Sequence, residues 1–89
     1  MRTVRLTIVG RVQGVYFRAS AKDMADKLGV NGWARNLPGK NVEIAATAAE
    51  EPLQQFIKWC RQGPPRAIVN NVIIEEVDME EFTGFRIIR

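Results

Sequence analysis

The fold of this chain is decided by the stretch VRLTIVGRVQGVYFRASAKDMADKL, residues 4–28, in which the hydrophobic period changes once. Val4, Leu6 and Ile8 alternate with polar residues, and this period of two predicts a half-buried β-strand. From Phe17 to Leu28 the apolar residues recur at helical spacing, with charged residues on the opposite side. The stretch therefore predicts a strand, a loop and an amphipathic helix in succession.

The rest of the chain continues the alternation of strands and helices. Further strands are predicted at residues 33–36, 42–46, 67–77 and 85–88, and a second helix has Pro52 in its first turn and ends at Gln62–Pro65. Asn70 and Asn71 predict a bend or bulge in the longest of these strands. The order indicates one domain, residues 1–89, with the ferredoxin-like β-α-β-β-α-β plan of the α+β class. It comprises a mostly antiparallel sheet, two helices on one face and a short extra C-terminal strand.

This plan makes a geometric prediction about two polar residues. Its first two strands run parallel with the third inserted between them, so their carboxyl ends share one edge, about 9–10 Å apart. The loop after the first strand ends in Arg18, and the second strand ends in Asn36. We therefore expect these two side chains to meet at one edge of the sheet.

Two features of the composition restrict the chemistry. The chain has no histidine, which excludes imidazole bases, imidazole metal ligands and Ser-His or Cys-His nucleophile systems. Its single cysteine, Cys60, excludes an internal disulfide and a multi-cysteine zinc site, and its place on an apolar helical stripe predicts a buried thiol. Any chemistry must use Arg, Lys, Asn, carboxylates or backbone amides.

Charge is distributed unevenly along the chain. The formal net charge is +3, but residues 1–45 hold eight bases and three acids, whereas residues 46–89 hold five bases and seven acids. An anionic ligand would be drawn to the first half. No apolar run approaches a membrane span or a signal peptide, and with a lone cysteine this predicts a cytoplasmic protein without a membrane partner.

The loop from Gly10 to Arg18 has the features of an anion-binding site. Its backbone N–H groups arrive at a helix N-terminus, Gly14 permits a tight backbone, and Arg18 offers a two-pronged contact to phosphate or carboxylate. The spacing of its glycines does not fit a dinucleotide fingerprint. From these residues alone, an ordinary loop with a surface arginine remains an equal alternative.

Two motifs carry a resemblance to a known family. Residues 12–18, VQGVYFR, and residues 32–36, GWARN, resemble the acylphosphatase family, as do residues 28–30, 62–65 and 82–85. The family's members are small cytoplasmic hydrolases that split the carboxyl–phosphate bond of acyl phosphates without metal or cofactor. The resemblance implies the same reaction here, with inorganic phosphate as product and expected competitive inhibitor.

The resemblance also implies roles for individual residues. The family's arginine, here Arg18, holds the phosphoryl group together with loop backbone amides, and the family's asparagine, here Asn36, orients the attacking water. The implied substrate-binding residues are Gln13, Gly14, Val15, Tyr16, Phe17 and Arg18. Tyr16 departs from the glycine that many members have at its position, and its ring is expected to narrow the mouth of the site.

The implied hydrolysis of acyl phosphates is compatible with a chain that lacks histidine and a metal site. The carboxylate leaving group of an acyl phosphate has low basicity and needs little help from a general acid, so positioning and charge stabilisation suffice. No side-chain base is evident near Asn36, and we therefore expect the substrate phosphate to accept the proton of the water.

Several other residues have simpler interpretations. Trp33 and Trp59 are predicted to be packing residues, and Arg11 and Arg35 to be solvated charges beside the site. No long apolar surface stripe requires a dimer, and a monomer is expected. The alternative function is a non-catalytic module that binds RNA on the sheet or binds a partner protein, although 8% aromatic residues supply a poor stacking platform.

Overall fold

The seven elements of the chain follow the predicted order. The computed structural model describes residues 1–89, with β1 (Arg2–Arg11), α1 (Phe17–Leu28), β2 (Asn31–Asn36), β3 (Val42–Ala48), α2 (Glu50–Gln62), β4 (Ile68–Val77) and β5 (Phe85–Ile88). α1 ends at Gly29, whose left-handed backbone (φ 77°) lets its N–H donate to the carbonyl of Ala25. Glycine has no Cβ to oppose this conformation, and the helix therefore stops at this residue.

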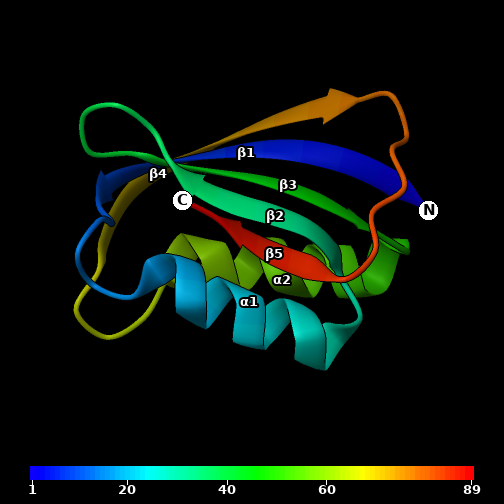
Figure 1. Cartoon of the computed structure of the whole chain (residues 1–89), viewed down its shortest axis with the longest axis horizontal. Helices are drawn as coiled ribbons and strands as arrows, with labels where there is room; N and C mark the ends of the chain where they lie inside the picture. Colours follow the sequence, from blue (N-terminus) through cyan, green and yellow to red (C-terminus); the bar gives the residue numbers. More distant parts are fainter.

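The five strands form one sheet in the order β4-β1-β3-β2-β5. β3 is antiparallel to both of its neighbours, and β5 is parallel to β2. Figure 1 shows α1 and α2 side by side on one face of the sheet, with the other face uncovered. The predicted ferredoxin-like α+β fold with a short fifth strand is confirmed.

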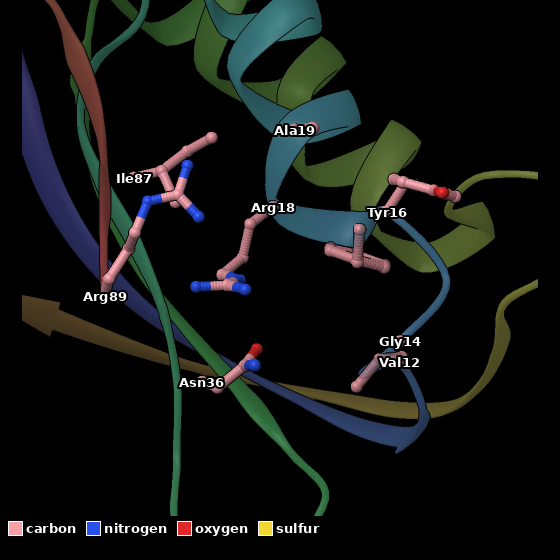
Figure 2. Close-up of a pocket in the computed structure, with 9 residues that line it drawn as sticks. Val12, Gly14, Tyr16, Arg18, Ala19, Asn36, Ile87 and Arg89 are labelled. Carbon is pink, nitrogen blue, oxygen red and sulfur yellow. The ribbon is translucent and has the colours of Figure 1, made fainter.

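The insertion of β3 between β1 and β2 brings the carboxyl ends of those two strands to one edge. Arg18, in the first turn of α1, and Asn36, the last residue of β2, lie together at this edge (Figure 2). The prediction that these two side chains lie together at one edge of the sheet is therefore confirmed.

The core lies between the helices and the covered face of the sheet. Alternation along β1 buries Val4, Leu6 and Ile8 completely, as the period of two predicts. Trp59 packs against Phe17, with ring centroids 5.4 Å apart, as predicted for a packing residue. Neither helix combines the length and apolar content needed to cross a membrane.

Cys60 is one of the buried residues of α2 and is unpaired, as its place on the apolar stripe predicts. Burial raises the pKa of its thiol far above the ordinary value, because the apolar core disfavours the charged thiolate. The thiol therefore acts as a small apolar group in the core.

Trp33, predicted to be a packing residue, packs on the uncovered face of the sheet and not in the core. Its ring is half-buried on this face, with the guanidinium of Arg5 at 5.1 Å from the ring centroid and that of Arg35 at 5.2 Å. Glu43 lies between the two arginines and pairs with both of them. Trp33 stands on the strand positions that face away from the helices, so cations stack on it in place of helix residues.

The predicted irregularity in β4 is confirmed as a bulge opposite Gly10. Val9 pairs with Asn71 and Gly10 with Val69, which leaves Asn70 without a partner in β1. A Cβ at Gly10 would overlap the carbonyl of Ile68, so the close approach of β1 and β4 at this point requires a glycine.

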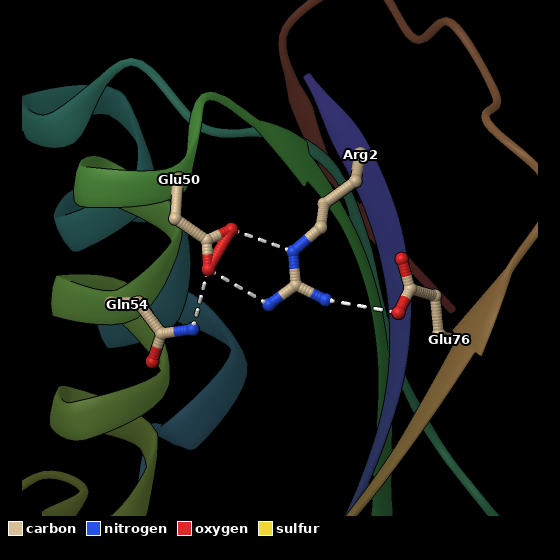
Figure 3. A network of polar contacts seen from close by, with 4 residues as sticks. All are labelled: Arg2, Glu50, Gln54 and Glu76. Atoms are coloured by element: carbon tan, nitrogen blue, oxygen red, sulfur yellow. Dashed lines mark hydrogen bonds and ion pairs between the residues drawn. The ribbon is translucent and has the colours of Figure 1, made fainter.

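A polar network joins β1, α2 and β4 at the protein surface (Figure 3). The guanidinium of Arg2 meets the carboxylate of Glu50 in two hydrogen bonds of 2.7 and 3.1 Å and reaches Glu76 at 3.4 Å. Gln54 donates to the same Glu50 carboxylate at 3.0 Å. The hydrogen bonds from Arg2 and Gln54 hold the pKa of the Glu50 carboxyl below its usual value.

This network predicts a pH dependence of stability. The folded-state pKa of Glu50 is depressed, so its stabilisation is complete above the unfolded-state pKa near 4.5 and is lost as pH falls through the lower folded-state value. Melting temperatures measured from pH 7 to pH 3 are expected to fall more steeply for the wild type than for Glu50→Gln, by a few degrees at most. Glu51→Gln, which removes a neighbouring unpaired acid, is the control, and parallel curves for wild type and Glu50→Gln would contradict the prediction.

Candidate active site

A hollow of about 460 Å³ opens at the edge where β1 and β2 end. It is lined by residues of the loop, α1, β2 and the end of the chain: Val12, Gly14, Tyr16, Phe17, Arg18, Ala19, Asn36, Ile87 and Arg89. Figure 2 shows the amide of Asn36 directed toward the guanidinium of Arg18, which lies between the loop and β5. The hollow therefore contains the two polar residues that the sequence places at this edge.

The loop before α1 presents free backbone N–H groups to this hollow. Gly14 (φ 74°) and Tyr16 (φ 63°) have left-handed backbones on either side of Val15, and alternating backbones of this kind are typical of anion-binding concavities. None of the N–H groups of residues 13–16 donates to a backbone carbonyl, and the N–H groups of residues 17–19 are the unpaired first donors of the helix. No side chain caps the helix, so these donors are available to an anion.

The side chain of Gln13 anchors the loop to the turn between β2 and β3. Its side-chain amide donates to the carbonyl of Leu37 at 2.9 Å and to that of Asn41 at 2.8 Å, and both carbonyls belong to the turn between β2 and β3. The side chain of Gln13 therefore ties the loop to the hairpin that carries Asn36.

The implied substrate-binding residues divide into two groups. Gly14, Tyr16, Phe17 and Arg18 line the hollow, whereas Gln13 and Val15 do not. The side chain of Val15 packs against the core, which anchors the middle of the loop. Only a backbone contact could bring Gln13 or Val15 to a ligand in the hollow.

Arg18 is held close to the fifth strand. Its Nη1 donates to the carbonyl of Ile88 at 3.3 Å, and its side chain is half-buried. This contact leaves the other guanidinium N–H groups free for a ligand, because an arginine has five donors. Asn36 is exposed at the end of β2, so its amide is accessible to water.

The hollow is electropositive. Arg18 and Arg89 line it, and no aspartate or glutamate does. A second hollow adjoins it and is lined by Arg18, Arg35, Asn36, Ile88 and Arg89. No three His, Cys, Asp or Glu side chains gather where they could hold a metal ion. The arrangement is therefore suited to binding anions through guanidinium groups and backbone amides.

The sequence did not indicate three of the residues in the first hollow. They are Ala19, Ile87 and Arg89. Parallel pairing of β5 with β2 brings the end of the chain to the site, and the sequence could not reveal this neighbour. The alternation of residues 85–88 indicated a strand but did not indicate which strand it joins.

Tyr16 has a backbone conformation that is strained for a side chain. It is the only residue other than glycine with a positive φ, and its side chain is 76% exposed, so the ring contributes little packing. Tyr16→Gly is therefore expected to have a free energy of unfolding about 1 kcal/mol higher than Tyr16→Ala, since only glycine adopts this backbone freely. Urea unfolding of both variants provides the comparison, and equal values would contradict a strained left-handed backbone.

Comparison with known proteins agrees with the fold and shows the family of the chain. A model of the acylphosphatase family matches residues 4–87. The chain is 43% identical over 90 residues to an acylphosphatase of Methylococcus capsulatus, covering 100% of this chain and 98% of the relative.

Solved structures give the same result. The crystal structure of acylphosphatase from Bacillus subtilis superposes with a TM-score of 0.96 at 34% identity, covering 100% of both chains. An acylphosphatase structure from Coxiella burnetii superposes with a TM-score of 0.93 at 36% identity over 97% of this chain and 90% of that one. Fold and site define a ferredoxin-like α+β domain with an arginine-lined hollow at one edge of its sheet. The chain belongs to the acylphosphatase family of enzymes.

Proposed function

We propose that this chain hydrolyses the carboxyl–phosphate bond of acyl phosphates, giving a carboxylate and inorganic phosphate. In this proposal Arg18 and the free loop N–H groups bind the phosphoryl group, and Asn36 orients the attacking water. The observation that supports it best is the run of unpaired N–H groups beside Arg18 in a hollow without acids. Such donors match the three oxygens of a phosphoryl group.

The proposed step is a direct displacement at phosphorus. The oxygen of the water held by Asn36 forms a bond to phosphorus while the bond from phosphorus to the acyl oxygen breaks. The electron pair of that bond leaves with the carboxylate. Arg18 and the backbone donors stabilise the negative charge on the equatorial oxygens, which is the main requirement of phosphoryl transfer.

The proton of the attacking water goes to an oxygen of the substrate phosphate. No aspartate or glutamate side chain lines the hollow. One acid follows the β3 residue that pairs with Asn36, but it already forms ion pairs on the other face of the sheet. That acid, Glu43, lies on the uncovered face and pairs with Arg35 at 2.6 Å and Arg5 at 3.7 Å. A side-chain base is therefore not part of the proposal.

The low basicity of the leaving carboxylate explains why so few groups suffice. A carboxylate departs without protonation, so the reaction as proposed needs neither a general acid nor a metal ion or cofactor. Inorganic phosphate presents the same oxygens to the same donors, and we expect it to compete with the substrate.

The alternative of an RNA-binding module has less support. RNA-binding sheets of this plan stack two or three bases on aromatic side chains of the open face. Here the strands place only Trp33 on that face, and two guanidinium groups already cover its ring. A single covered ring does not provide a stacking platform.

The test is hydrolysis of benzoyl phosphate and acetyl phosphate by purified protein in the presence of a chelator. We expect turnover that persists with the chelator and competitive inhibition by inorganic phosphate. Loss of activity on chelation would overturn the metal-independent mechanism. A folded protein without hydrolysis, together with salt-sensitive binding of single-stranded RNA, would favour the alternative.

The proposal also includes the oligomeric state and the cellular compartment of the protein. We expect a monomer, which size-exclusion chromatography with light scattering would test. The expected compartment is the cytoplasm, where a reducing environment keeps the thiol of Cys60 unmodified.

A further inference from the structure

The site carries more positive charge than one phosphoryl group requires. Two hollows adjoin each other across Arg18 and Asn36: the first is lined by Arg18 and Arg89, and the second also by Arg35. No aspartate or glutamate lines either of them. A recess with several guanidinium groups and no aspartate or glutamate side chain favours a ligand with more than one anionic group.

The three arginines differ in the ion pairs and hydrogen bonds that their guanidinium groups already form. Arg35 is held by Glu43 at 2.6 Å on the uncovered face of the sheet. Arg18 donates to the carbonyl of Ile88 and faces the loop donors. Arg89 takes part in none of the five ion pairs and donates no side-chain hydrogen bond, so its guanidinium is free.

Strand register places the backbone of Arg89 level with the proposed water-binding residue. β5 runs parallel to β2 with Ile88 opposite Arg35, so the next pair in register is Arg89 and Asn36. Figure 2 shows the side chain of Arg89 running away from Asn36, with its guanidinium next to Ile87 on the side of the hollow across from Arg18. The two cations therefore flank one cavity from different elements, α1 and the end of β5.

We propose that Arg89 binds a second anionic group, carried by the acyl part of the substrate, while Arg18 and the loop bind the phosphoryl group. This inference rests on the proposed function and narrows its substrates to acyl phosphates whose acyl group bears a carboxylate or a phosphate. A guanidinium binds either group through two parallel N–H donors. Arg89 is then a specificity-determining residue, separate from the groups that bind the reacting phosphorus.

Matched substrates test the proposal. Benzoyl phosphate is compared with its meta-carboxy, para-carboxy and para-phosphono derivatives, which share one ring and differ in the added anion. For the wild type we expect a KM about threefold to tenfold lower for the favoured anionic derivative than for benzoyl phosphate. The derivative with the greater advantage identifies whether Arg89 selects a carboxylate or a phosphate.

A pair of variants separates local binding from net charge. Arg89→Gln is expected to bring the KM ratio between benzoyl phosphate and the favoured derivative to about one. Arg86→Gln removes the same charge three residues earlier, from β5, but its side chain is on the uncovered face opposite Trp33, so the ratio is expected to persist. Equal KM values for neutral and anionic substrates in the wild type, or an equal loss of the ratio in both variants, would overturn the proposal.

The two proposals fail in different ways. If the wild type hydrolyses none of these compounds, the proposed function itself is wrong. If it hydrolyses benzoyl phosphate without an advantage for any anionic derivative, only the role of Arg89 is wrong.

Discussion

Arg18→Ala is expected to lower kcat/KM for benzoyl phosphate by about a thousandfold or more, with the fold intact. The guanidinium supplies the only side-chain cation that stands both in the first turn of α1 and beside the free N–H groups of the loop. Preorganised donors to a transferring phosphoryl group contribute about 10² to 10⁵ in rate. The side chain is half-buried and bonds only the carbonyl of Ile88, so its removal is expected to cost little stability.

The two proposed catalytic residues are expected to differ in kinetics. Arg18→Ala should raise KM and lower kcat, because the guanidinium binds the phosphoryl group before and during the reaction. Asn36→Ala should lower kcat with little change in KM, because water orientation matters in the transition state alone. Arg61→Ala, at an exposed position on α2, is the control for loss of one arginine. Wild-type kinetics in Arg18→Ala would contradict the assignment of the phosphoryl site.

The geometry of the site follows from topology to a large extent. The period of two before Gly10 and the helical period after Phe17 are strong local signals, and both elements form where the sequence predicts them. The insertion of the third strand then brings Arg18 and Asn36 to one edge without any knowledge of function. Local pattern and connection rules suffice because both residues lie directly at the ends of these elements.

Other parts of the site depend on contacts that a linear pattern does not contain. Arg89 reaches the hollow because β5 pairs with β2, and a four-residue strand carries no signal of its partner. The left-handed backbone of Tyr16 is unexpected for a tyrosine, and it lies in a loop that Gln13 ties to the hairpin and Val15 ties to the core. Trp33 was predicted to be a packing residue, but the sequence did not indicate on which face of the sheet it packs, because hydrophobicity alone does not distinguish the covered face from the uncovered one.

Gly32→Ala is expected to destabilise the fold by about 3–5 kcal/mol, a large part of the stability of a small domain. Gly32 lies in β2 between β3 and β5, with φ 147° and an N–H that donates to the carbonyl of Gly84 at 2.9 Å. A Cβ there would overlap the carbonyl of Ala45 in β3. β3 lies between β1 and β2 and has no room to withdraw, so the clash adds to the backbone strain of a side chain at this φ.

Gly39→Ala separates these two costs. Gly39 also has a positive φ, 98°, but it lies in the turn after β2 and a Cβ there would meet no atom within 4 Å. Only the backbone strain applies, and the expected loss is about 1–2 kcal/mol. Urea unfolding and melting temperatures of both variants measure the difference, with a drop of about 15 °C or more for Gly32→Ala. If the two variants lose the same stability, backbone strain alone explains why position 32 requires a glycine. The close approach of β2 to β3 at Gly32 would then be contradicted.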